Sequence, residues 1–277
     1  MRLSLQQVTL VAIDTRAPAL AAESLLRSMA QVEFGRVMLF TAGWCPQVPV
    51  PGLEVVDIAP IKSGADYSRF VLRQLPAHVK TSHVLITQWD GFVVDASAWR
   101  SEFLNYDYVG SVWPDQPEGR NVGNGGFSLR SRRMLAAGTD PRIVDEHPED
   151  EALCRTHRSL LESERGISYA PSALARQFAY ENETPTVAAF GFHGPSNLAR
   201  VLDGPTLQRW LAALPDDFFR GRDARRLARA LLARRMTSTA QALLLRRDSV
   251  GRREPATRLL GWWAAAQALW PSRGPGA

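Results

Sequence analysis

The stretch SHVLITQWDGFV, residues 82–93, decides how this chain folds. It contains the apolar run VLI, residues 84–86, and reads as a strand buried on both faces of a sheet. Asp90 follows at the end of this strand, and Gly91 then allows the backbone to bend. Because a buried carboxylate is costly unless something offsets its charge, we expect Asp90 to face a ligand crevice.

Strands and helices alternate before this stretch. The apolar runs at 8–14, 36–40 and 53–58 read as further strands, and the segments 19–32 and 67–79 have helical spacing. The order β-α-β-β-α-β predicts an α/β fold with a mainly parallel central sheet flanked by helices. Ligands bind beyond the carboxyl ends of strands in such sheets, and Asp14, Thr15 and Asp90 all stand at such ends.

Composition places the chain among ordinary globular proteins, with 277 residues, 45% of them hydrophobic and 22% charged. We expect no secretory signal at the start and no membrane-spanning run, which favours a cytoplasmic location. Cys45 and Cys154 form no pattern. A reduced setting with both cysteines as packing residues fits them better than a metal or redox role.

Charge is distributed unevenly along the chain. Residues 205–277 contain fourteen arginines and five acids, a net charge of +9, whereas residues 1–204 contain nineteen basic and twenty-three acidic residues, a net charge of −4. This asymmetry predicts a body, 1–204, and an arginine-rich helical C-terminal extension, 205–277. In the extension one apolar stripe is expected, formed by Leu227, Leu231, Leu232, Met236, Leu243 and Leu244.

Three polar features could carry chemistry: Asp90, the pair Glu149 and Asp150, and His193. A carboxylate and an imidazole together suit Mn²⁺ or a similar ion such as Mg²⁺. With only two protein ligands, such an ion keeps coordination positions open for a diphosphate and water. Ordinary alternatives exist for each residue, since Asp90 could cap a turn, His193 could be a loop histidine and the acid pair could simply begin a helix.

The segment GNGGFS, residues 123–128, is rich in glycine. It is neither a dinucleotide fingerprint nor a Walker loop. Its glycines permit backbone amides to approach a ligand, and Phe127 offers a flat face for a sugar ring. A plain surface turn is the alternative.

Taken in order, the motifs QWDGFV, AWRSEFLNYDYVGSVWP, GNGGFSLRSRRML, HPEDEALC and FGFHG resemble the bacterial family DUF5672, of unknown function. That family is regarded as glycosyltransferase-like with a GT-A, or Rossmann-like, fold. The resemblance covers residues 8–194 and excludes the arginine-rich extension. More distantly, the motifs are similar to those of β-1,4-galactosyltransferases.

This resemblance implies a set of roles. The Asp-x-Asp motif of those enzymes corresponds to Gln88-Trp89-Asp90, so Asp90 would be a metal ligand while Gln88 departs from the pattern. A late histidine completes their metal site, and His193 stands in a comparable position. Their catalytic base lies in a Gly-Gly-Glu-Asp segment, which is split here, so that Asp150 beside Glu149 would be the base. We expect Asp150 to stay ionised because a helix N-terminus favours the anion.

The implied activity is transfer of a sugar from a nucleotide-diphosphate sugar, with a UDP-sugar favoured, to a hydroxyl of a glycan or another acceptor. It would depend on Mn²⁺ or Mg²⁺ and invert the anomeric carbon. The residues expected to contact the donor or acceptor are Asp14, Thr15, Arg16, Lys62, Tyr67, Ser68, Gln88, Trp89, Asn124, Gly125, Gly126, Phe127 and Arg130.

Two other classes of function stay open. The chain could be a sugar-nucleotide or glycan-binding module without catalysis, which the missing acid at Gln88 would suit. Alternatively, the basic extension could bind nucleic acid, a protein partner or the inner face of a membrane. No nucleic-acid-binding module is recognisable, so we do not favour nucleic acid.

Overall fold

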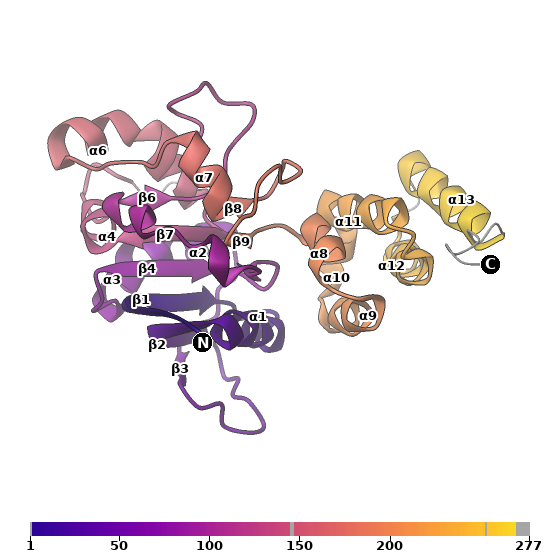
Figure 1. Ribbon diagram of the computed structural model, residues 1–277. Helices are drawn as coiled ribbons and strands as arrows, with labels where there is room; N and C mark the ends of the chain where they lie inside the picture. The colour runs from indigo at the N-terminus through magenta and orange to yellow at the C-terminus, as the bar shows by residue number, and fades with distance from the viewer. Residues whose placement is uncertain (1, 145–146, 253, 270–277) are drawn as a thin grey trace. The chain divides into compact units, whose positions relative to one another are not determined.

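The computed structural model describes residues 2–144, 147–252 and 254–269 (Figure 1). The chain forms two compact units, residues 1–193 and 194–277. The sequence had suggested a boundary after Gly204. The division lies earlier because α8 (Pro195–Val201) packs against α11 (Arg222–Ala233) of the second unit. Among the described helices, none has the length and apolarity to cross a bilayer.

A six-stranded sheet forms the centre of the first unit, in the order β3-β2-β1-β4-β7-β6. Four of the strands are parallel to one another: β1 (Leu3–Ile13), β2 (Val32–Thr41), β3 (Leu53–Asp57) and β4 (His83–Thr87). The other two, β7 (Phe127–Ser131) and β6 (Tyr108–Val109), add an antiparallel edge beside β4. This arrangement confirms the predicted α/β fold with a mainly parallel sheet.

Helices cover both faces of this sheet, and the strands alternate accordingly. In β1, Leu10 and Ala12 pack in the same cluster as residues of α1 (Pro18–Gln31). The intervening Val11 and Ile13 pack in the cluster of the helical segment between β3 and β4. Both faces of each central strand are therefore buried, which explains the unbroken apolar runs in the sequence.

The helical segment between β3 and β4 has three parts, α2 (Gly64–Arg69), a π-helical segment η1 (Phe70–Gln74) and α3 (Leu75–His78). Pro76 occupies the first turn of α3, where its missing N–H is tolerated. The remaining helices of the first unit are α4 (Arg132–Ala137), α5 (Glu149–Glu151), α6 (Arg158–Arg165) and α7 (Ser172–Phe178), with a second π-helical segment, η4 (Ala152–Thr156), between α5 and α6.

A small second sheet, in the order β5-β9-β8, connects distant parts of the chain. In it β5 (Phe92–Val93) is antiparallel to β9 (Gly191–Phe192), and β8 (Ala179–Tyr180) is parallel to β9. The register pairs Phe92 with Phe192 and Tyr180 with Phe192. Because β5 begins just after Asp90 and β9 ends just before His193, this sheet brings the two predicted metal ligands together.

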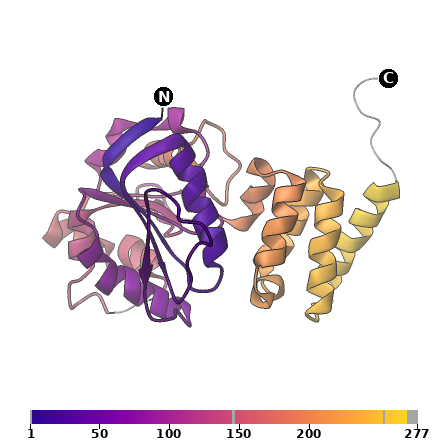
Figure 2. The same cartoon turned by 90° about the horizontal axis from the view of Figure 1, so that it is seen from below.

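The second unit is entirely helical within the described residues, and its helices lie side by side in Figure 2, where they are orange to yellow. It contains α8, α9 (Gly204–Ala213), α10 (Asp216–Arg220), α11, α12 (Thr237–Ser249) and α13 (Pro255–Leu269). The predicted stripe is inside, since five of its residues are buried and Met236 is half-buried. On α11 the residues Arg222, Arg226 and Arg229 are exposed.

Candidate active site

The candidate site lies at the carboxyl ends of β1 and β4, where the chain turns out of the sheet. After β4, residues 88–91 form a turn in which the Gly91 N–H donates to the Gln88 carbonyl (3.1 Å). Buried hydroxyls of α1 hold this turn, because Ser24 donates to the Gln88 carbonyl (3.0 Å) and Ser28 accepts from the Val93 N–H (3.1 Å). The fold therefore fixes the path of the residues that follow the strand.

Asp90 and His193 meet in this turn. Asp90 Oδ1 lies 3.4 Å from His193 Nε2, although the residues are far apart in sequence. The side-chain amide oxygen of Gln88 lies 3.2 Å from the same nitrogen. Gln88, Asp90 and His193 thus converge on one point, as the motif comparison predicted for the last two.

Glu181, which the sequence reasoning missed, orients His193. The parallel pairing of β8 with β9 places Glu181 beside His193, and its Oε1 lies 3.0 Å from His193 Nδ1. With Nδ1 held by a carboxylate, Nε2 faces Gln88 and Asp90. Histidines that bind metals commonly have a carboxylate on the second ring nitrogen, which fixes the ring and its tautomer.

Electrostatics at His193 also favour a positive charge. Burial on its own lowers the pKa of His193, but Asp90 and Glu181 outweigh it and raise that pKa well above its ordinary value. In addition, Asp90 Oδ1 is buried and pairs with His193 Nε2 at 3.4 Å. The surroundings of Asp90 therefore suit a cation.

The donor atoms present fit a hard or borderline divalent ion. They comprise a carboxylate oxygen, an amide oxygen and an imidazole nitrogen, which are ligands that Mn²⁺ and Mg²⁺ accept. Within residues 2–144, 147–252 and 254–269, no group of three His, Cys, Asp or Glu side chains is placed to hold a metal. Any ion bound here would thus depend on Gln88 and on ligand oxygens in addition to Asp90 and His193.

The acid pair forms the second half of the site. Glu149 Oε1 accepts a hydrogen bond from Arg130 Nη2 (2.8 Å), and the two side chains are only 4% and 0% exposed. The Arg130 guanidinium also lies over the Tyr108 ring, 5.1 Å from its centroid. The expectation that Arg130 contacts a substrate phosphate is therefore wrong. Its charge is buried and neutralises Glu149 instead.

Asp150 lies beside this ion pair. It accepts hydrogen bonds from the backbone N–H groups of Gly125 (2.8 Å) and Glu151 (2.9 Å). Burial, followed by the nearby charge of Glu149, nevertheless raises the pKa of Asp150 to about 6. The helix N-terminus does not hold this pKa at a low value, because desolvation prevails over the hydrogen bonds from the backbone. A carboxylate with such a pKa is ionised at neutral pH and more basic than a solvated one.

The glycine segment joins the two halves of the site. A Cβ on Gly126 would lie 2.1 Å from His193 Nε2, and one on Gly125 would lie 2.5 Å from Glu149 Oε1. Asn124, at φ 69°, accepts a hydrogen bond from the Gly126 N–H (3.0 Å) and donates to Glu181. This segment is therefore a packed part of the site and not a plain surface turn.

Several other residues that were predicted to contact a ligand are buried or half-buried in the structure. Phe127 as a sugar platform is wrong, because its ring is fully buried against Phe178 and Phe190. A ligand contact through Ser68 is also wrong, since Ser68 is buried and hydrogen-bonded to His147 Nδ1 (2.9 Å). Trp89 is half-buried and packs against the core cluster.

Tyr67 belongs to the site. Its hydroxyl is buried and has no well-aligned hydrogen bond within the described residues. Burial, with a smaller contribution from Glu149, raises the pKa of Tyr67 far above its usual value, so the hydroxyl stays protonated. It can therefore donate a hydrogen bond to a ligand.

The end of β1 contributes a further carboxylate. Asp14 accepts hydrogen bonds from the backbone N–H groups of Arg16 and Ala17, both at 2.7 Å. Burial raises the pKa of Asp14, and the nearby charge of Asp90 acts in the same direction. The Thr15 hydroxyl is bound to the backbone of Ile61 (3.0 and 3.3 Å). Arg16 and Lys62 are exposed at this edge.

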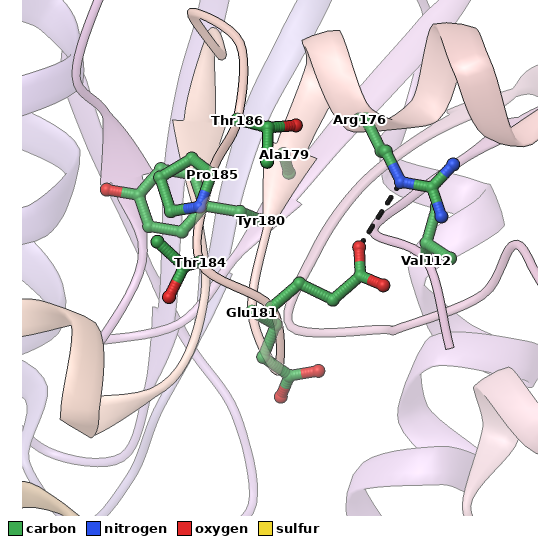
Figure 3. Close-up of a pocket in the computed structure, with 9 residues that line it drawn as sticks. Val112, Arg176, Ala179, Tyr180, Glu181, Thr184, Pro185 and Thr186 are labelled. Atoms are coloured by element: carbon green, nitrogen blue, oxygen red, sulfur yellow. Dashed lines mark hydrogen bonds and ion pairs between the residues drawn. The ribbon is translucent and has the colours of Figure 1, made fainter. Parts of the chain in front are cut away.

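A cavity of about 400 Å³ adjoins Glu181 (Figure 3). Arg176 and Glu183 pair across its wall (3.2 Å). The lining residues are Val112, Arg176, Ala179, Tyr180, Glu181, Glu183, Thr184, Pro185 and Thr186. The lining therefore combines apolar side chains with charged and hydroxyl groups, beside the residue that orients His193.

Comparison with known proteins gives the family. The chain belongs to the family described as "Protein of unknown function (DUF5672)", which matches residues 52–193, and this confirms the resemblance seen in the motifs. No protein with a curated description matches the sequence significantly.

Many solved structures are similar to this one, including two glycosyltransferases. One is the galactosyltransferase LgtC in complex with donor and acceptor sugar analogues, at 11% identity and a TM-score of 0.37, covering 67% of this chain and 86% of that one. The other is the mannosyltransferase PcManGT from Pyrobaculum calidifontis in complex with GDP-Man and Mn²⁺, at 14% identity and a TM-score of 0.41, covering 96% of this chain and 88% of that one.

Proposed function

We propose that this protein is a glycosyltransferase that moves a sugar from a nucleotide-diphosphate sugar to an acceptor hydroxyl. One observation carries the proposal: Gly125 and Gly126 join a cation-compatible set of donors and an acid of raised pKa into a single site. A UDP-sugar as donor, a glycan or another hydroxyl compound as acceptor, and a cytoplasmic location belong to the same proposal.

The donor side of the site would hold the diphosphate with a divalent ion. Asp90 and His193 would be its protein ligands, assisted by the amide oxygen of Gln88, and Glu181 would position His193. A bound Mn²⁺ or Mg²⁺ supplies Lewis-acid stabilisation of the negative charge that develops on the diphosphate. With an amide in place of the usual first acid, the protein itself offers one negative charge fewer to the ion.

On the acceptor side Asp150 would act as the base. The acceptor oxygen forms a bond to the anomeric carbon, the bond from that carbon to the diphosphate breaks, and the acceptor proton passes to an Asp150 carboxylate oxygen. The Gly125 N–H holds the carboxylate in place. A base opposite the leaving group gives inversion at the anomeric carbon. With its pKa near 6, transfer should become faster as pH rises through 6.

Unsatisfied polar atoms support a polar ligand at this position. Asp90 Oδ1 and the Tyr67 hydroxyl are buried and make no well-aligned hydrogen bond among the described residues, although Asp90 Oδ1 pairs with His193 Nε2 at 3.4 Å. Buried polar atoms in proteins are nearly always hydrogen-bonded to protein or solvent. Two such atoms around one site are what a site that binds a charged, oxygen-rich molecule would present.

Donor binding can be tested by thermal stabilisation. We expect a nucleoside diphosphate or its sugar to raise Tm only when Mn²⁺ is present, and Asp90→Ala to abolish the shift. Asp115→Ala is the matched control, because Asp115 lies in an exposed loop and should leave the shift intact. If no nucleotide among UDP, GDP, ADP, CDP and dTDP stabilises the protein with metal, the proposal is wrong.

Catalysis is tested separately with Asp150→Asn. Loss of a general base lowers the rate by about 10²- to 10⁴-fold, while donor stabilisation should persist because Asp150 lies on the acceptor side. Release of nucleoside diphosphate with a panel of glycan acceptors measures this rate. Donor binding without any turnover in the unaltered protein would instead indicate a sugar-nucleotide-binding module.

A further inference from the structure

Helix α13 of the second unit is attached by one face only. Thr257, Leu260 and Ala264 are buried and recur at helical spacing. They pack toward α12 and α11, and the Gln267 side chain donates to the Leu232 carbonyl at the end of α11 (2.9 Å). The helix is thus a built part of the second unit.

Its opposite face is apolar and exposed. Leu259, Trp262, Trp263 and Leu269 are 60, 71, 39 and 84% exposed, and their spacing places them on one side of the helix. Leu245 of α12 is 70% exposed. A helix that is apolar on both faces is normally covered on both. In the described part of the chain, five of the nine exposed large hydrophobic residues lie on these two helices.

A groove of about 440 Å³ lies beside this face, between α12 and α13. Leu244, Leu245 and Ala264 give it an apolar lining. Arg252 and Arg258 also line it, together with one acid, Asp248, and Arg252 is in addition ion-paired with Glu254 (3.5 Å). Apolar surface therefore adjoins guanidinium groups that can pair with phosphate.

The net charge of the second unit favours one kind of binding partner for this exposed face over another. Residues 194–277 contain fifteen arginines and six acids, a net charge of +9. Two copies docking through α13 would bring these like charges together, which opposes self-association. An anionic surface is complementary instead. Tryptophan, with an apolar ring system and one N–H, is enriched where hydrocarbon meets the polar headgroups.

We propose that the exposed apolar face of α13, formed by Leu259, Trp262, Trp263 and Leu269, docks on the surface of an anionic lipid bilayer. The helix would lie in the plane of the headgroups, with Leu259 and Trp262 in the apolar boundary and Arg252 and Arg258 beside lipid phosphates. Its 15 residues are too few to span a bilayer. An apolar face combined with basic residues supplies the two contributions that hold such helices at membranes. This role is independent of the proposed transfer reaction.

Sedimentation of the full chain with lipid vesicles tests the proposal. We expect binding to phosphatidylcholine vesicles containing 30% phosphatidylglycerol and at least about tenfold weaker binding to pure phosphatidylcholine. Raising NaCl from 0.05 to 0.5 M should weaken binding because salt screens the charges. Leu259→Ser with Trp262→Ser should weaken it at least about tenfold, since each removes large apolar surface from the contact.

Controls distinguish this role from the alternatives. Val48→Ser, at an apolar residue of the first unit that is 74% exposed, should leave vesicle binding unchanged. The proposal is overturned if the protein does not bind anionic vesicles, or if the variant with both Leu259→Ser and Trp262→Ser binds them as well as the unaltered chain. It is equally overturned if sedimentation velocity shows a dimer that the double variant abolishes, because a second copy would then cover the face. Unchanged far-UV circular dichroism verifies that the variants are folded.

Discussion

An ion pair buried in the first unit can be compared with one that is exposed in the second. In the first unit Arg130 and Glu149 form an ion pair that is almost fully buried. In the second unit many arginines are exposed, as in the pair of Arg226 with Asp223, whose side chains are 56 and 54% exposed. The excess of basic residues in the sequence thus identifies the second unit and says nothing of where the candidate site lies. The candidate site lies in the acidic unit, where a few charges are buried and held in fixed positions.

Glycines show the same contrast. Gly126 has no room for a side chain, because the His193 ring occupies the position of its Cβ. Gly261 of α13 has nothing within 4 Å of that position. Gly126 is required by the packing of the candidate site, whereas Gly261 only lowers the stability of its helix. Substitutions at matched positions in the two units should therefore have opposite or very unequal effects.

The largest difference is expected for the arginines. Arg130→Met leaves Glu149 buried without a partner and should lower the free energy of unfolding by about 3–5 kcal/mol. Arg226→Met removes an exposed pair, worth at most about 1 kcal/mol. Hydrogen exchange of amides in each unit measures the two effects separately. A loss below about 1 kcal/mol for Arg130→Met would mean that Glu149 is solvated or protonated.

Gly126→Ala and Gly261→Ala form the next comparison. The first forces a methyl group into the His193 ring and should cost about 1–3 kcal/mol, as overpacking does, together with metal-dependent nucleotide binding. The second should stabilise α13 by about 0.5–1 kcal/mol, because alanine is the better helix former. Thermal unfolding with and without Mn²⁺ and nucleotide measures both. If Gly126→Ala keeps full binding, the ring is free to move away and does not form a fixed ligand.

A smaller effect is expected from the carboxylate that positions His193. Glu181→Gln should weaken Mn²⁺ binding in the presence of nucleoside diphosphate by about 10- to 100-fold, the usual cost of losing such a partner. Electron paramagnetic resonance of free Mn²⁺ measures this without any turnover. Glu183→Gln, which alters a carboxylate paired with Arg176 on the same loop, is the control. Equal effects of the two substitutions would remove Glu181 from its positioning role.

The smallest effect concerns stability and pH. Because the pKa of Asp150 rises from 3.8 to about 6 on folding, the folded state binds the proton more tightly than the unfolded chain. The contribution of Asp150 to stability is thus present in full below pH 3.8 and is lost as pH rises through 6. Asp150→Asn should raise the free energy of unfolding at pH 7.5 by on the order of 1 kcal/mol and have little effect near pH 3.5. Urea denaturation at both pH values, with Asp115→Asn as control, measures it, and a destabilised variant at pH 7.5 would contradict the raised pKa.

The strands that position the candidate site could be predicted from the sequence. Long apolar runs identify buried strands, so the ends of β1 and β4 and the position of Asp14 and Asp90 followed from pattern alone. The family motifs led to His193 and Asp150. The separate basic extension followed from the count of charges along the chain.

What the sequence could not supply were partners brought together by tertiary structure. Arg130 was mistaken for a phosphate contact because burial of a charged pair leaves no local pattern. Glu181 was missed because β8 and β9 have only two residues each, too few for a period to show. An ionised Asp150 could be expected from a helix start, but its raised pKa could not, because desolvation depends on neighbours far along the chain.

The contact between Gly126 and the His193 ring has a consequence for how this family can diverge. A methyl group at position 126 and an imidazole at position 193 compete for the same space, so the two positions cannot change independently. A member without the histidine would be released from this conflict and could carry alanine or serine at the glycine. A member that retains the histidine must keep the glycine, so a paired substitution at these two positions is the change expected wherever this packing is given up.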